Sequence, residues 1–279
     1  MSQAGTALAD PSTGALEACH DEAVPVMPGA EPFTHDGNDV GVLLCHGFTG
    51  TPQSLRGWAD RLAAEGFSVR LPRLPGHGTT WAELNRTKWP DWYAAVEAEL
   101  LALAPTHETV VVGGLSMGGA LALRLAQQHP DLVDGLMLVN PAVKLTDSRL
   151  RVLPVLRHFV PSTPGIASDI RKQGATELAY DRTPLHALHS SIQMYAEIER
   201  ALPQISTPIL MMRSAVDHVV PVTSPTRVLD RVSSADVTDV LLHDSYHVAT
   251  LDEDAELIYS QSVAFVQRIA ARDSGEVRS

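Results

Sequence analysis

A serine framed by glycines is the residue of this chain best suited to chemistry. It is Ser116, at the centre of a Gly-x-Ser-x-Gly pentapeptide at residues 114–118. The β-branched run 109–113 before it predicts a buried strand, and residues 119–129 predict a helix that Pro130 ends. Such a pentapeptide also occurs by chance. On a sharp strand-to-helix turn, however, its hydroxyl would point out of the sheet edge, beside a helix N-terminus that favours negative charge. The pattern therefore indicates a nucleophile.

Two later residues could activate this serine, because a serine hydroxyl needs a base near neutral pH. When a serine on such a turn works with an acid and a histidine, the acid follows the serine and the histidine comes last. Asp217 stands just after a predicted strand at 208–213, and His247 follows the last predicted strand, 237–242. We expect His247 to take the Ser116 proton and pass it to the leaving alcohol. Asp217 would fix the imidazole tautomer and stabilise the imidazolium.

Alternatives exist for the acid and the base. The chain has twelve histidines, and Asp244 is the alternative to Asp217 as the acid. His218 is adjacent to Asp217, but neighbouring side chains diverge where a strand ends. The remaining histidines that we compared are expected to be solvated or lack a strand end before them: His129, His243, His107, His158, His186 and His189.

Two backbone N–H groups should stabilise the anionic intermediate of such a reaction. One is expected from Met117, directly after the nucleophile. The other is expected from Phe48, in the turn at residues 46–50 after the first predicted core strand. The alternative is that His46 and Gly47 simply make a turn. The Gly-His-Gly run at 76–78 lacks the Lys-Ser/Thr of a phosphate-binding loop and is interpreted as a turn near the site.

Strands and helices alternate along most of the chain, which predicts a mostly parallel sheet with helices on both faces. Strands are predicted at 41–45, 67–71, 109–113, 132–140, 208–213 and 237–242, and helices at 52–65, 91–104, 119–129, 226–232 and 253–271. The proline-divided segment 141–204 breaks the alternation and is too long for a loop, so we expect a cap over the carboxyl edge of the sheet. Residues 29–140 and 205–272 would form the core, and 1–28 and 273–279 tails.

Composition excludes several classes of function. The formal net charge is −12 and no basic patch appears, so we do not expect this protein to bind nucleic acid. No apolar run approaches the ~20 residues that span a bilayer. Residues 1–22 contain no Lys or Arg and no apolar core, so we predict no secretory signal and a cytoplasmic location. Cys19 and Cys45 are not expected to form a disulfide. No metal motif appears, and we expect neither a metal nor another cofactor.

Several motifs together resemble the bacterial carboxylesterases and monoacylglycerol lipases of the α/β-hydrolase superfamily. They are HGFTGTPQSL, LPRLPGHGT, GLSMGG, DHVVP and SYHVATLD, and the similarity runs from about residue 29 to the last helix, with the Bacillus-type monoacylglycerol lipases as the nearest group. The resemblance implies an α/β-hydrolase fold with a cap insertion. It also implies a triad of Ser116, Asp217 and His247, with the Phe48 and Met117 amides as the oxyanion hole.

The resemblance extends in part to the cap. Residues 168–170 and 177–180 are similar to cap segments of those lipases, and the likeness implies that Glu177 contacts the glycerol hydroxyls of the substrate. A carboxylate can accept hydrogen bonds from both hydroxyls of a vicinal diol. The alternative is a solvated glutamate on a helix face. Residues 144–160 depart from the family pattern.

Three functions are compatible with these observations. The first is a serine hydrolase that cleaves monoacylglycerols and related short- to medium-chain esters through an acyl-enzyme. The second is a general carboxylesterase without a glycerol preference. The third is a non-catalytic binding protein with a hydrolase fold, which the complete set of candidate catalytic residues disfavours. The expected partner is a small-molecule ester, with transient contact to a lipid surface.

Overall fold

The computed structural model describes residues 24–165 and 168–273. Most of the expected N-terminal tail, including Cys19, and nearly all of the C-terminal tail therefore lie outside the described residues. Contact with the core begins before residue 28, because the Met27 N–H donates to the Gly78 carbonyl at 2.8 Å. None of the described helices is both long enough and apolar enough to cross a membrane.

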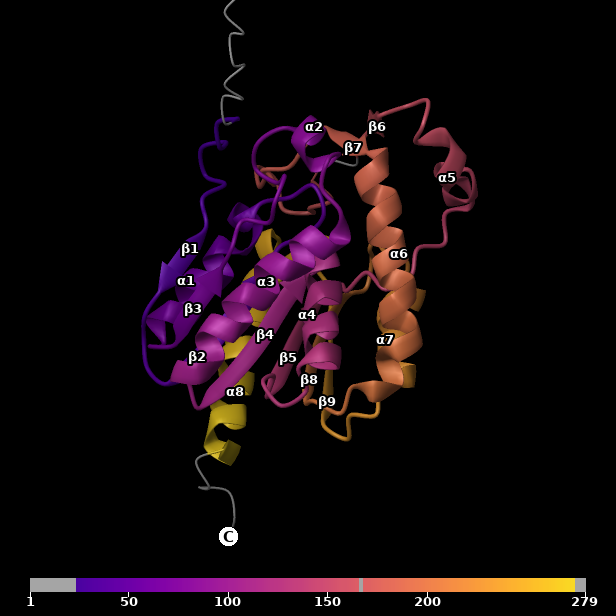
Figure 1. The fold of residues 1–279 in the computed structure, drawn as a ribbon. Coiled ribbons are helices and arrows are strands. Elements are labelled where there is room, and N and C mark those ends of the chain that lie inside the picture. The colour runs from indigo at the N-terminus through magenta and orange to yellow at the C-terminus, as the bar shows by residue number, and fades with distance from the viewer. Residues whose placement is uncertain (1–23, 166–167, 274–279) are drawn as a thin grey trace, which may run out of the picture.

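A seven-stranded sheet forms the centre of the molecule, as Figure 1 shows. Its order is β1-β3-β2-β4-β5-β8-β9, and every neighbouring pair is parallel except β1 and β3. The expected mostly parallel sheet is confirmed. The strands are β1 (Phe33–His35), β2 (Val40–Cys45), β3 (Ser68–Leu71), β4 (Thr109–Leu115), β5 (Gly135–Val139), β8 (Ile209–Ser214) and β9 (Val237–Leu242).

Alternating side chains of the central strands build two separate cores, one on each face of the sheet. In β2, for example, Leu43 and Cys45 belong to one core and Val42 and Leu44 to the other. The first core is covered by α3 (Trp89–Leu103), α4 (Met117–Gln128), α6 (Leu185–Ala201) and α7 (Thr223–Arg231). The second is covered by α1 (Arg56–Ala64) and α8 (Ala255–Asp273), which lies behind the sheet in Figure 1. The strands therefore end between two helical layers.

The turn between β4 and α4 holds Ser116 in an unusual backbone conformation. Ser116 has φ +56° and ψ −116°, a region that a non-glycine residue rarely adopts. A Cβ on Gly114 would overlap the backbone of Gly118, and a Cβ on Gly118 would overlap the Cys45 carbonyl at the end of β2. Both glycines are therefore required by the close approach of backbone to backbone.

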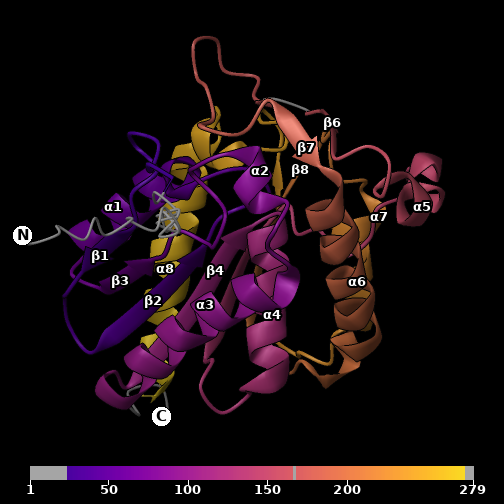
Figure 2. The same ribbon diagram turned by 45° about the horizontal axis from the view of Figure 1, so that its top comes forward.

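The segment between β5 and β8, which we expect to form a cap, divides into two parts. The first part contains α5 (Leu153–Leu156), at the periphery in Figure 2, and a small hairpin of β6 (Ser162–Pro164) and β7 (Arg182–Pro184). The second part is α6, which lies beside α4. The Gln127 side chain on α4 donates to the Ile198 carbonyl of α6 at 3.0 Å. The latter part of residues 141–204 thus packs with the sheet layers.

Short elements connect these layers. A single turn of helix, α2 (Trp81–Leu84), precedes α3, and 3-10 turns occur at η1 (Pro52–Leu55), η2 (Ala104–Thr106), η3 (Ser148–Arg151), η4 (Leu202–Gln204) and η5 (Ala249–Leu251). The sequence patterns did not predict β1, α2 or the hairpin of β6 and β7. These elements have only three or four residues, too few to show a period.

The close approach at Gly118 leads to a prediction about stability. Gly118→Ala should lower the free energy of unfolding by about 1–3 kcal/mol or more, because the new Cβ must displace backbone rather than a flexible side chain. Denaturant unfolding would measure the loss. Gly47→Ala is the matched control, since a Cβ there meets its nearest atom at an ordinary 3.6 Å. Equal stability of the two variants would contradict the backbone-contact interpretation.

Candidate active site

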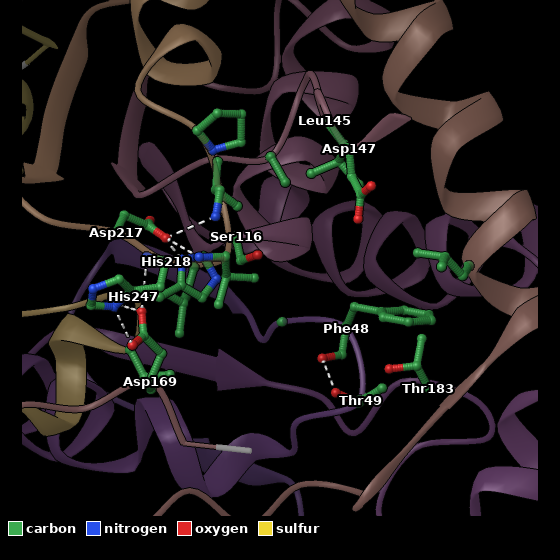
Figure 3. A pocket seen from close by; sticks show the side chains of 18 of the residues that line it. Phe48, Thr49, Ser116, Leu145, Asp147, Asp169, Thr183, Asp217, His218 and His247 are labelled. Atoms are coloured by element: carbon green, nitrogen blue, oxygen red, sulfur yellow. Dashed lines mark hydrogen bonds and ion pairs between the residues drawn. The ribbon is translucent and has the colours of Figure 1, made fainter. Parts of the chain in front are cut away.

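A cavity of about 500 Å³ lies where the parallel strands end. Its wall combines the turn after β2, the turn at Ser116, the loops after β8 and β9, and residues from the segment between β5 and β8. Figure 3 shows this pocket with Ser116, Asp217 and His247 beside one another. Ser116 is 8% exposed, so its hydroxyl faces the cavity from an otherwise buried position.

Asp217 and His247 form a directly bonded pair. His247 Nδ1 lies 2.7 Å from Asp217 Oδ2, and both side chains are less than a tenth exposed. The other carboxylate oxygen, Oδ1, accepts the N–H groups of Val219 and Val220, each at 2.8 Å. These bonds occupy the carboxylate and direct it at the ring. The Nε2 side of His247 is thereby the side left to face a substrate.

The surroundings of His247 favour its charged form. Burial, the largest single effect, would lower the pKa of this imidazole, but the hydrogen bond and charge of Asp217 together with nearby carboxylates outweigh it. Glu177 and Asp169 add smaller contributions of the same sign, so the pKa lies above its ordinary value. A histidine in this setting can accept a proton and stabilise the resulting charge.

Asn140 holds the His247 loop and was not predicted as a site residue. Its side-chain Nδ2 donates to the His247 carbonyl at 2.8 Å and to Ser214 Oγ at 2.9 Å, while Oδ1 accepts the Ser214 N–H. Asn140 is 2% exposed and directly follows β5 at φ +44°. The signal available in the sequence was a polar residue that ends an apolar strand, immediately before Pro141.

The alternative acid and base are placed differently. Asp244 forms an exposed ion pair with Arg171 at 2.8 Å and is not part of the pocket wall. His218 lines the pocket, but its Nδ1 lies 2.8 Å from Asp169 Oδ1 and its side chain is 56% exposed. In the described part of the chain, no group of three or more His, Cys, Asp and Glu residues could hold a metal ion.

The two residues expected to supply oxyanion-binding amides lie on the turns next to the candidate nucleophile and on its pocket. Met117 is the first residue of α4, where a backbone N–H has no acceptor within its own helix. Phe48 lies in the turn after β2 and lines the pocket, as Figure 3 shows. The Thr49 carbonyl in this turn accepts the Tyr180 N–H at 3.2 Å, which ties the turn to the segment between β5 and β8. Both amides thus come from fixed turns.

Two buried histidines beneath the Phe48 turn have a structural role. His46 Nδ1 lies 3.0 Å from the Gly47 carbonyl, and its Nε2 accepts the Leu74 N–H at 3.1 Å, as a neutral ring would. The His77 ring packs edge-on against His46, with centroids 5.0 Å apart. Burial, with a smaller contribution from Arg73, lowers the pKa of His46 to about 4, and burial also lowers the pKa of His77 well below its usual range.

Glu177 reaches the pocket from a firmly docked segment. Gln53 donates to the Thr176 carbonyl at 3.2 Å and accepts the Leu178 N–H at 2.9 Å, so it clamps the chain on both sides of Glu177. A Cβ on Gly50 would lie 2.6 Å from Glu177 Oε1, so the carboxylate occupies the space that a side chain at residue 50 would need. Burial raises the pKa of Glu177 to about 7, against an opposing effect of His247.

This combination of fold and site defines the class of the protein. A serine on a strand-to-helix turn, followed in the chain by an acid and then a histidine at later strand ends, is the arrangement of the α/β-hydrolases. The central sheet, parallel except at β1, and its two helical layers have the architecture of that fold.

Comparisons with known proteins give the family. A family model described as serine aminopeptidase, S33, matches residues 38–254, and the chain belongs to this family. The thermostable monoacylglycerol lipase of Bacillus sp. strain H-257 is 40% identical over 251 residues, which are 89% of this chain and 99% of that protein. The carboxylesterase of Bacillus subtilis strain 168 is 24% identical over 246 residues, 86% of this chain and 97% of that protein.

A solved structure agrees with the sequence relatives. It comes from work on LipS and LipT, two metagenome-derived lipolytic enzymes, and is 40% identical to this chain. It superposes with a TM-score of 0.85 and covers 88% of this chain and 100% of its own. The likeness therefore includes the fold as a whole and not only the short motifs around Ser116.

The neutral histidines beneath the Phe48 turn predict a loss of stability in acid. The unfolded chain protonates His46 near pH 6.5 and the folded chain only near pH 4, so acidification between these values favours unfolding. Each such histidine should remove roughly 1 kcal/mol of unfolding free energy per pH unit. Denaturant unfolding from pH 7 to 5 should show a shallower slope for His46→Gln than for the wild type. His243→Gln, at an exposed position, should keep the wild-type slope; equal slopes for all three proteins would contradict this role.

Proposed function

We propose that this protein is a serine ester hydrolase that cleaves monoacylglycerols and related short- to medium-chain carboxylic esters. The observation that carries the proposal is the shared pocket of Ser116 and the bonded pair of Asp217 and His247. The relatives support it, since the protein 40% identical to this chain is a monoacylglycerol lipase and a more distant one is a carboxylesterase.

The reaction would proceed in two halves. Ser116 Oγ attacks the ester carbonyl while His247 Nε2 takes the hydroxyl proton, and the carbonyl oxygen becomes an anion facing the Met117 and Phe48 amides. Collapse breaks the bond to the alcohol, which leaves with the proton from His247. Water then attacks the acyl-enzyme, again giving a proton to His247, and the carboxylic acid departs as Ser116 is restored.

The pocket has separate surfaces for the two parts of a monoacylglycerol. Leu145, Leu150 and Leu188 contribute apolar wall that suits an acyl chain. Glu177 lies on the same pocket as Ser116, and no described side chain donates a hydrogen bond to its carboxylate. A vicinal diol could donate two hydrogen bonds there. Residues 141–204 would then act as a cap that selects the substrate.

A general carboxylesterase is the second candidate, and the Bacillus subtilis carboxylesterase relative supports it. The two functions share the same catalytic groups and differ in whether Glu177 recognises glycerol. The cytoplasmic location, inferred from the sequence alone, stays a prediction.

Removal of the nucleophile tests the catalytic proposal. Ser116→Ala should lower kcat by roughly 10⁵-fold or more, while the fold persists because the turn depends on the flanking glycines. Release of p-nitrophenol from a butyryl ester would measure the rate, and thermal unfolding would verify the fold. Ser260→Ala, on the exposed face of α8, is the control and should be fully active. A tenth of the wild-type activity in Ser116→Ala would show that another residue attacks. No activity in the wild type would favour a binding protein.

Glu177→Gln tests the glycerol preference, because it keeps the shape and removes the charge. A charge-assisted hydrogen bond contributes about 1.5–3 kcal/mol, so kcat/KM for monolauroylglycerol should fall roughly 10- to 150-fold. The assay belongs at pH 8, where a group whose pKa is raised to about 7 is ionised. Hydrolysis of p-nitrophenyl laurate, which has no diol, should barely change.

Two comparisons make this test specific. Glu256→Gln, on the exposed surface of α8, should leave both rates unchanged. Equal losses on both substrates in Glu177→Gln would indicate a structural role for the carboxylate. No loss on either would favour the general carboxylesterase.

A further inference from the structure

One carboxylate outside the catalytic pair bonds to both loops that carry the pair. Asp169 Oδ2 accepts the backbone N–H groups of His218 and His247, each at 3.1 Å. Its Oδ1 lies 2.8 Å from His218 Nδ1, and its own carbonyl accepts the Val248 N–H at 3.1 Å. Figure 3 shows Asp169 beside both histidines. Residues adjacent to Asp217 and at His247 are thus joined through a single side chain.

The segment around Asp169 is itself anchored from below. Asp252, which is 1% exposed, accepts the N–H groups of Arg171 and Lys172 at 2.7 and 2.8 Å. The same carboxylate accepts the Tyr246 N–H at 2.9 Å, directly before His247. Asp169 therefore has a fixed position from which it can hold the two loops.

The residue before Asp169 connects this anchor to the substrate side of the pocket. Ser168 has φ +43°, and its Oγ accepts the Glu177 N–H at 3.0 Å. Two adjacent residues thus make both connections. Ser168 bonds to the candidate glycerol-binding residue, and Asp169 bonds to the loops of the acid and the base. No bond of this kind is implied by the sequence resemblance, which gave roles only to Glu177, the triad and the two oxyanion amides.

We propose that Asp169 is a positioning residue that sets the distance and orientation between Asp217 and His247 and adds negative charge beside the imidazolium. The inference rests on the proposed function. The side chain is 10% exposed, and desolvating a carboxylate is costly unless donors satisfy it. Three donors do so here, and all of them come from the two loops concerned.

The charge of Asp169 acts together with that of its neighbours. Asp217, Glu177 and Asp169 are the groups whose charges raise the pKa of His247, and burial opposes them. His218 faces Asp169 from the other loop and shares its Oδ1 side. Loss of the Asp169 charge should therefore make His247 easier to deprotonate, whereas loss of its hydrogen bonds should misplace the ring.

Three variants separate these effects: Asp169→Ala, Asp169→Asn and the control Asp244→Asn. Asp169→Asn keeps an oxygen that can accept the two backbone N–H groups but removes the charge. Asp244→Asn removes an exposed carboxylate that forms an ion pair with Arg171. Each variant is assayed with p-nitrophenyl laurate and monolauroylglycerol from pH 5 to 9. The burst of p-nitrophenol counts competent sites, and thermal unfolding reports the fold.

In Asp169→Ala, kcat should fall about 10- to 100-fold on both substrates with little change in KM, because a misplacement of about 1 Å costs a rate factor of this size. In Asp169→Asn most of the rate at pH 8 should return. Its acid limb of kcat/KM, which in the wild type reports the raised pKa of His247, should move to lower pH. Asp244→Asn should match the wild type in rate and in pH profile.

Wild-type kcat in Asp169→Ala would overturn the positioning role. If the acid limb of kcat/KM in Asp169→Asn stays where it is in the wild type, the electrostatic role is overturned. This test remains available even when Asp169→Ala fails to fold. Absence of any p-nitrophenol release by the wild-type protein would instead reject the proposed function, so the two failures are distinguishable.

Discussion

The contact between the start of α4 and the end of β2 constrains the turn that carries Ser116. Gly118 presses against the Cys45 carbonyl, and Gly119 packs against Pro141 after β5, so the helix begins in the space between two strand ends. Ser116, at the turn before this helix, has φ +56°, and Gly47 of the turn that carries Phe48 lies beside it. The candidate nucleophile and both candidate oxyanion donors therefore lie around one backbone contact, before any later part of the chain contributes.

The acid and the histidine arrive from the other half of the sheet, and polar side chains rather than apolar packing hold their loops. Apolar contacts are non-directional and can fix a strand or a helix against a core, but they do not aim an imidazole. Asn140, Asp252 and Asp169 supply directional bonds to the backbone around His247. All three are buried or nearly so, and each also links segments distant in sequence, as Asp252 does through its bond to the Arg171 N–H. The geometry of the site thus depends on a small number of satisfied carboxylates and one amide.

Sequence patterns predicted the fold well where apolar residues repeat over a strand or a helix. The strand at 237–242 was placed with correct bounds, whereas β5 is shorter than the predicted strand at 132–140. The predicted helix at 119–129 begins at Met117, because its glycine-rich start shows no amphipathic period. Ser116, Asp217 and His247 could be named from motif order and lie together. Asn140 and Asp169 could not, since their bonds cross 107 and 78 residues and a polar residue in a loop has no local signature.

The distribution of charge around the pocket matches the charges that an ester hydrolysis would create. Carboxylates gather around His247, where a proton and a positive charge would appear, and they raise the pKa of its ring. Beneath the Phe48 turn, His46 and His77 are buried and their pKa values are lowered, so these two rings are uncharged at neutral pH. An oxyanion there would meet backbone dipoles beside two uncharged rings. Since both charges would form in one step, a site with acidic groups at one end and neutral donors at the other stabilises the two together.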